Sequence, residues 1–75
     1  SQKRKLERAV SDAEAKIEKL EAEEQEIQTE MENPDIAASF EKLGPLQEKL
    51  SAVQEQLDQA NTDWENALET LDEFE

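Results

Sequence analysis

The chain has 75 residues, and its 21 acidic and 8 basic side chains give a net charge of −13 at pH 7. It contains no Cys and no His, which excludes disulfides, the commonest zinc sites and catalysis by a thiol or an imidazole. Its single Gly is too few for a Gly-rich phosphate loop, and no apolar run is long enough to span a bilayer. We therefore expect a non-catalytic, cytoplasmic chain that holds no cofactor or metal and does not cross a membrane.

The first part of the chain carries a heptad pattern. Its apolar residues recur at alternating steps of three and four, at Leu6, Val10, Ala13, Ile17, Leu20, Ile27 and Met31. This spacing predicts an amphipathic helix over about residues 4–32. Glu24 holds the one polar position of this seam. We expect its stem to lie along the seam with the carboxylate in water, and a polar contact that sets the register is the alternative.

Asn33-Pro34-Asp35 is the strongest break in the chain. Pro34 has no amide proton to continue a helix, and its ring pushes the preceding residue out of the α region. The same pair suits the N-cap and first residue of a new helix. We expect a connector over residues 33–44 that forms a short helix or turn, with Ile36 and Phe40 folded onto the end of the molecule.

A second heptad pattern follows the connector. Gly44-Pro45 predicts its start, because Gly suits the end of one segment and Pro the first position of a helix. We expect this helix over about residues 45–74. Trp64 lies on its seam, and we interpret it as a core residue rather than as a stacking platform for a base. The seam residues are Leu43, Leu46, Leu50, Val53, Leu57, Ala60, Trp64, Ala67, Leu71 and Phe74.

Two long amphipathic helices with a short connector pack antiparallel, so the predicted fold is all-α, a two-helix coiled-coil hairpin. A register that sets large residues against small ones fills the seam without voids. If one helix slides by one heptad relative to the other, some of the pairs between a large and a small residue are kept. In the favoured register Glu24 faces Val53, and the apolar layers are Met31–Leu46, Ile27–Leu50, Leu20–Leu57, Ile17–Ala60, Ala13–Trp64 and Val10–Ala67.

Charge is unevenly placed along the chain. Residues 1–19 hold six bases and four acids, whereas residues 20–75 hold two bases and 17 acids. Because nucleic-acid binding depends on cationic side chains, the candidate contacts with nucleic acid or the ribosome are Lys3, Arg4, Lys5 and Arg8. Two other interpretations stay open. This segment is the exit from a basic linker, or its cations complement the acidic end of the partner helix.

Several of these features occur together in one known family. They are the basic start Lys3-Arg4-Lys5-Leu6-Glu7, the Leu-Glu-rich stretch over residues 17–23, the Asn33-Pro34-Asp35 break, the Leu heptads over residues 43–57, and Trp64-Glu65. The sequence resembles the C-terminal coiled-coil domain of ABC-F ATP-binding cassette proteins, closest to the Uup-type branch. Two departures stand out. Ala67, followed by Leu68, holds a place where the family tends to have Leu, and residues 20–75 are more acidic than family tails credited with nucleic-acid contact.

The resemblance implies a role inside a larger protein. ABC-F proteins carry two ATPase cassettes in one chain and act on the ribosome in translation, and some Uup-type members are linked to DNA binding through this tail. The implied partners are upstream cassettes of the same chain and the ribosome or nucleic acid. ATP would bind in those cassettes, so no catalytic or cofactor residue is carried over to this domain.

Two rival functions remain open. The first is a structural or dimerisation hairpin of an unrelated coiled-coil protein, such as a prefoldin-like or tRNA-synthetase arm. The second is a DNA- or RNA-binding hairpin that uses the basic start of the chain. Self-association is compatible with each of them.

Overall fold

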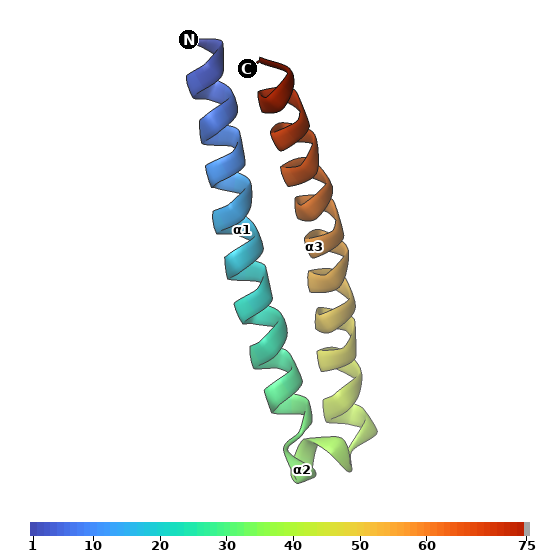
Figure 1. Ribbon diagram of the computed structural model, residues 1–75. Helices are drawn as coiled ribbons and strands as arrows, with labels where there is room; N and C mark the ends of the chain where they lie inside the picture. The colour runs from blue at the N-terminus through green and yellow to red at the C-terminus, as the bar shows by residue number, and fades with distance from the viewer. Residues whose placement is uncertain (75) are drawn as a thin grey trace.

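The computed structural model describes residues 1–74, which form three helices. Helix α1 spans Gln2–Met31, α2 spans Pro34–Ala37 and α3 spans Phe40–Phe74. Helices α1 and α3 run antiparallel side by side, and α2 closes one end (Figure 1). We call the end with α2 the tip and the end with both termini the root. The predicted all-α hairpin is confirmed, and the molecule measures 54 × 14 × 14 Å.

The ends of α1 follow from local hydrogen bonds. Ser1 is its N-cap, since the Ser1 hydroxyl accepts from the amide of Arg4 at 3.3 Å. The helix therefore begins at Gln2, two residues before the predicted start. It ends at Met31, and the amide of Asn33 still donates to the carbonyl of Glu30 at 3.1 Å before the chain turns.

Helix α2 forms as the sequence predicts. Asn33 is its N-cap, with an extended backbone, and the Asn33 side-chain oxygen accepts from the amide of Asp35 at 3.0 Å. Pro34 is the first helical residue, where no amide proton is needed. Ile36 on this helix is half-buried, as expected for a residue that covers the end of the hairpin.

Helix α3 begins earlier than the predicted start at residue 45. The Ser39 hydroxyl accepts from the amide of Lys42 at 3.4 Å, and the Ser39 carbonyl accepts from the amide of Leu43 at 2.8 Å. This cap starts the helix at Phe40, so Gly44 and Pro45 both lie inside α3. Pro45 removes one backbone hydrogen bond near the helix start, which the exposed first turns tolerate because water can reach the free carbonyl.

Phe40 departs most from expectation. We predicted that it folds onto the end of the hairpin, but it is 95% exposed. The early start of α3 explains the difference. Phe40 becomes the first residue of the helix, about 100° around its axis from the seam residues, rather than part of a free connector.

The core is the seam between α1 and α3. Leu20, Val53 and Ala60 are its buried cluster, with Ile17, Ile27 and Leu57 packed against it, and Leu46 is buried nearer the tip. The other predicted seam residues are half-buried, except Phe74 at the root, which is 51% exposed. With so narrow a core, stability depends on the fit of a few layers.

Two hydrogen bonds that cross between the helices fix the register. Glu24 Oε2 accepts from Gln54 Nε2 at 3.2 Å, and Gln54 follows Val53, the predicted partner of Glu24. Glu14 Oε2 accepts from Trp64 Nε1 at 3.3 Å, and Glu14 follows Ala13, the predicted partner of Trp64. Both bonds agree with the favoured register. Glu24 is half-buried and its hydrogen bond to Gln54 lies at the exposed edge of the seam, so the expected position of the stem and the alternative polar contact occur together.

None of the helices within residues 1–74 is both long enough and apolar enough to cross a membrane.

Candidate functional site

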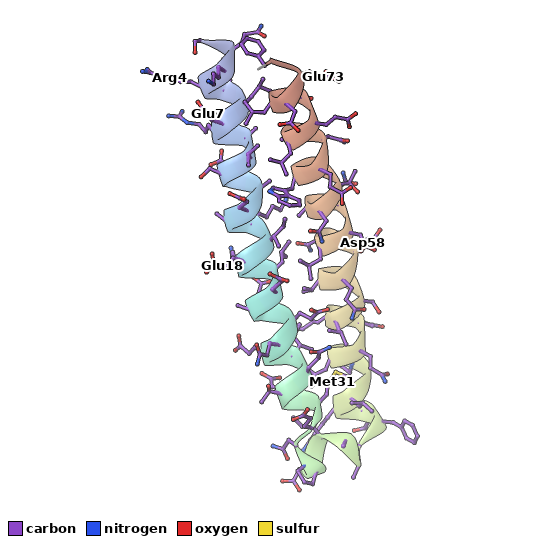
Figure 2. All side chains as sticks on the ribbon, in the orientation of Figure 1. Arg4, Glu7, Glu18, Met31, Asp58 and Glu73 are labelled. Atoms are coloured by element: carbon purple, nitrogen blue, oxygen red, sulfur yellow. The ribbon has the colours of Figure 1, made fainter. Side chains whose placement is uncertain are left out.

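The basic residues at the start of α1 gather at the root. Arg4, Lys5 and Arg8 are exposed and line one shallow hollow together with Ser1 and Glu7. We call Arg4, Lys5 and Arg8 the root cluster. Arg4 projects from the side of α1 that is turned away from α3 (Figure 2). Three of the four candidate contacts are therefore brought together on one open surface.

Lys3 occupies a different position. It is exposed but does not line the hollow of the root cluster. Successive residues of an α-helix are about 100° apart, so Lys3 lies roughly 60° from the seam residue Leu6. It stands at the edge of the contact between α1 and α3 rather than on the outer surface.

Two further cations extend the root cluster along α1. Lys16 and Lys19 are exposed, and the helical repeat places them in the same sector of about 120° as Arg4, Lys5 and Arg8. We call these five residues the basic face. Sequence reasoning missed Lys16 and Lys19 because it followed the run of adjacent bases; a helical projection of charge would have found them.

Acids also lie in or beside the basic face. Asp12 shares its sector, and Glu7 lines the same hollow as the root cluster. Glu18 lies about 40° around the helix from Arg4 and is seen on the flank away from α3 in Figure 2. The root half of α1 therefore presents a strip in which five cations outnumber these three carboxylates.

The tip half presents the opposite charge. A groove between α1 and α3 is bordered by Glu23, Glu26 and Glu30, with Lys49 on the α3 side. Its apolar floor is formed by Ile27, Leu46, Ala52 and Val53. We call this surface the tip groove. The helical repeat places its three glutamates in the same sector of α1 as the root cluster, roughly 30 Å further along the helix.

Trp64 lies in acidic surroundings. It is half-buried, its indole N–H is bonded to Glu14, and it borders a small hollow with Glu18 and Glu21. Three carboxylates beside the ring repel phosphate, so this position does not suit a stacked nucleic-acid base. The interpretation of Trp64 as a seam residue fits the structure better, although the ring is not fully enclosed.

Acidic side chains and hydroxyls are further possible sites of chemistry. Within residues 1–74 no three acidic side chains are grouped closely enough to hold a metal ion. The hydroxyls of Thr62 and Thr70 donate to backbone carbonyls four residues earlier in α3, at 3.0 and 2.8 Å. Such bonds are typical of Thr within a helix and serve the helix itself.

The fold and its surface define a helical hairpin arm in which the root half of α1 carries the basic face, while the tip and the root half of α3 are acidic. A family model described as the ABC transporter C-terminal domain matches residues 1–70, which is most of the chain. The chain belongs to this family. It is a helical C-terminal domain of an ABC-related protein and not a catalytic cassette. Neither a curated protein nor a solved structure is significantly similar to it.

Proposed function

We propose that this hairpin is the non-catalytic C-terminal arm of an ABC-F protein that acts on the ribosome in translation. The arm binds or positions, and the ATP-hydrolysing cassettes lie elsewhere in the same protein. Membership of the ABC transporter C-terminal domain family supports a partnership with cassettes and makes an unrelated coiled-coil protein the weaker alternative. The closest branch by resemblance is the Uup type.

We further propose that the basic face contacts the phosphates of nucleic acid, ribosomal RNA being the natural target for an ABC-F protein. The observation that carries this is the convergence of Arg4, Lys5 and Arg8 on one exposed surface of the root. Cations bind phosphate by displacing condensed counterions, and this needs charged side chains that face outward. Lys16 and Lys19 lengthen the surface to about 22 Å along α1.

The acidic tip limits where a nucleic acid can bind. The tip groove has three glutamates at its border, and only Lys49 offsets them. A phosphate backbone is repelled there and attracted along the basic face of α1. The root half of α3 repels it as well, because Glu65, Glu69, Asp72 and Glu73 are exposed there without a base. The contact is therefore confined to the α1 side of the root. This polarity suits an appendage that touches RNA near its attachment to the cassettes while the tip remains free for another contact.

Binding to a labelled RNA duplex, followed by fluorescence anisotropy, tests the phosphate contact. We expect binding that weakens as salt is raised. The slope of log affinity against log salt falls by about 0.9 for each phosphate contact that is removed. Arg4→Gln and Arg8→Gln should each lower this slope, whereas Lys42→Gln, an exposed cation at the tip, should leave it unchanged. A DNA duplex serves as the second probe, because contacts between the basic face and phosphates depend on charge and not on base sequence.

Two results would overturn this contact. The first is no salt-dependent binding to either duplex. The second is binding that Lys42→Gln weakens as much as Arg8→Gln does, since the basic face would then have no special role.

The role in a larger ABC-F protein needs its own experiment. Deleting residues 1–75 from the full-length protein should leave basal ATP hydrolysis largely intact and reduce its association with ribosomes. Loss of ATP hydrolysis on deletion would instead show that the hairpin is a structural part of the cassettes. Unchanged ribosome association would remove the ribosomal role while leaving the family membership in place.

A further inference from the structure

One sector of α1, which runs from the outer side of the root to the border of the tip groove, is self-complementary in charge. The root cluster and the glutamates of the tip groove lie in the same sector of the helix, one group near each end. A second copy turned end over end therefore places basic residues over acidic ones at both ends. We propose that two copies of the hairpin associate through this face of α1, antiparallel and related by a two-fold axis.

The pairing can be read residue by residue. A two-fold axis that passes between Ala15 and Lys16 sets each residue opposite the one at an equal distance on the other side. Three charged pairs then meet, and each joins opposite signs: Lys5 with Glu26, Arg8 with Glu23, and Asp12 with Lys19. Because the contact is isologous, each pair occurs twice in the dimer.

The centre of the face combines small and long side chains. Ala15 and Ala22 lie in the same sector and are exposed, which leaves room between the two helices. The Lys16 side chains of the two copies lie beside the axis, and their flexible stems let the two ammonium groups turn outward into water. Toward each tip, the long stems of Lys5 and Arg8 from the partner cover the border of the groove whose floor contains Ile27 and Val53.

The net charge of −13 on each copy opposes association in general. Charges further apart than about 8 Å are screened at physiological ionic strength, so the pairs in direct contact count for more than the distant repulsion. The two effects predict opposite responses to salt. Paired charges make the dimer weaken as salt is added, whereas a contact held by apolar surface against net repulsion would strengthen.

Analytical ultracentrifugation of the 75-residue chain over a range of concentrations, with no nucleic acid present, tests the proposal. We expect a reversible monomer–dimer equilibrium that weakens as NaCl is raised from roughly 20 mM to roughly 300 mM. A chain that stays monomeric at every concentration, or an association that strengthens with salt, would overturn it.

Charge reversal identifies the face. Arg8→Glu and Glu23→Arg should each weaken dimerisation about tenfold or more, since each turns two attractive pairs into two repulsive ones. The double variant Arg8→Glu/Glu23→Arg should restore dimerisation to within about threefold of the wild type. Failure of the double variant to recover, with helicity retained by circular dichroism, would contradict this pairing.

Two control variants test whether a change of net charge alone explains the loss of dimerisation. Lys42→Glu makes the same charge change as Arg8→Glu at an exposed tip residue, and Glu65→Arg makes the same change as Glu23→Arg on α3. Both should leave the salt-sensitive dimer within about twofold of the wild type. If either control weakens the dimer as strongly as its counterpart, net charge and not this face governs association, and the proposal is wrong.

Discussion

At the scale of single residues, Trp64 shows how a narrow seam accommodates a large side chain. The hairpin is two helices thick, so the ring packs over α1 with one edge left at the surface. The indole N–H reaches Glu14 at 3.3 Å, which satisfies the polar edge that the seam cannot cover. The packing and the hydrogen bond can be separated by substitution.

Trp64→Phe should cost no more than about 1 kcal/mol of unfolding free energy, because most ring contacts remain and one exposed hydrogen bond is lost. Trp64→Ala should cost about 2 kcal/mol, roughly half the value for a fully buried Trp. Urea denaturation followed by circular dichroism measures both. Equal losses for the two variants would mean that the indole hydrogen bond, and not the ring packing, holds this layer.

Gly44 lies inside α3 without positive φ, directly before Pro45. Apart from its chain neighbours, a Cβ placed on it meets nothing within 4 Å. Ala is about 0.8–1.0 kcal/mol more favourable than Gly within a helix, but the ring of Pro45 crowds a Cβ on the helical residue before it. Because the two effects oppose each other, we expect Gly44→Ala to change the free energy of unfolding by less than about 0.5 kcal/mol, seen as a nearly unchanged urea midpoint.

A loss of more than about 1 kcal/mol in Gly44→Ala would contradict the continuous helix through Gly44 and Pro45, because such a loss is typical of a Gly that needs positive φ. It would instead support the original expectation that α3 begins at Pro45 and that Gly44 ends the connector. Gly44 therefore also tests the largest difference in helix boundaries between sequence and structure.

At the scale of elements, α2 is a single helical turn that depends on its cap. The Asn33 side chain satisfies the amide of Asp35, and the Asn33 carbonyl accepts from the amide of Ala37 at 2.8 Å. Asn33→Ala removes the side-chain bond and should cost about 1 kcal/mol. Asn66→Ala, an exposed Asn in the middle of α3, should be neutral or slightly stabilising, because Ala favours the helix.

Hydrogen exchange gives the matching local measurement. The amides of Asp35 and Ala37 should exchange faster in Asn33→Ala than in the wild type, while those of α1 and α3 near the root should change little. Faster exchange throughout the chain would mean that α2 supports the whole hairpin rather than only its tip.

The long helices and their pairing were predictable from the sequence, whereas the tip was not. A heptad repeat states which side of a helix is buried, so the seams and the register both followed from spacing. The sequence predicted that α3 begins at Pro45, because Gly suits the end of one segment and Pro the start of a helix. The Ser39 side chain caps the helix five residues earlier, so α3 begins at Phe40. The direction of Phe40 followed from that start, and no periodic pattern covers so short a segment.

The candidate site was predictable in part for a similar reason. The run of bases at the start of the chain pointed to Arg4, Lys5 and Arg8, which the helix brings together. The same run included Lys3, which the helical repeat turns toward the seam. Lys16 and Lys19 join the basic face only when the chain is wound into a helix.

At the scale of the whole molecule, charge opposes folding. A net charge of −13 on a hairpin 54 Å long and 14 Å wide creates repulsion that salt can screen. At pH 7 and low protein concentration we expect the melting temperature to rise with added NaCl. If screening is worth about 1 kcal/mol, the rise is about 4–8 °C for a domain of this size.

KCl should give the same rise as NaCl, because screening depends on ionic strength and not on the cation. A variant with Glu26→Gln and Glu30→Gln should melt at a higher temperature in low salt and respond less to salt. A melting temperature that falls with salt would mean that specific attractive pairs outweigh general repulsion within the monomer.

NMR of the ¹⁵N-labelled chain, titrated with an unlabelled RNA duplex, tests most directly whether the basic face of α1 binds phosphate while the acidic tip does not, because every amide reports separately. We expect shifts concentrated in residues 4–19 of α1, with residues 23–55 around the tip unmoved. Shifts centred on the tip, or no shift in residues 4–19 at any concentration of RNA, would contradict it.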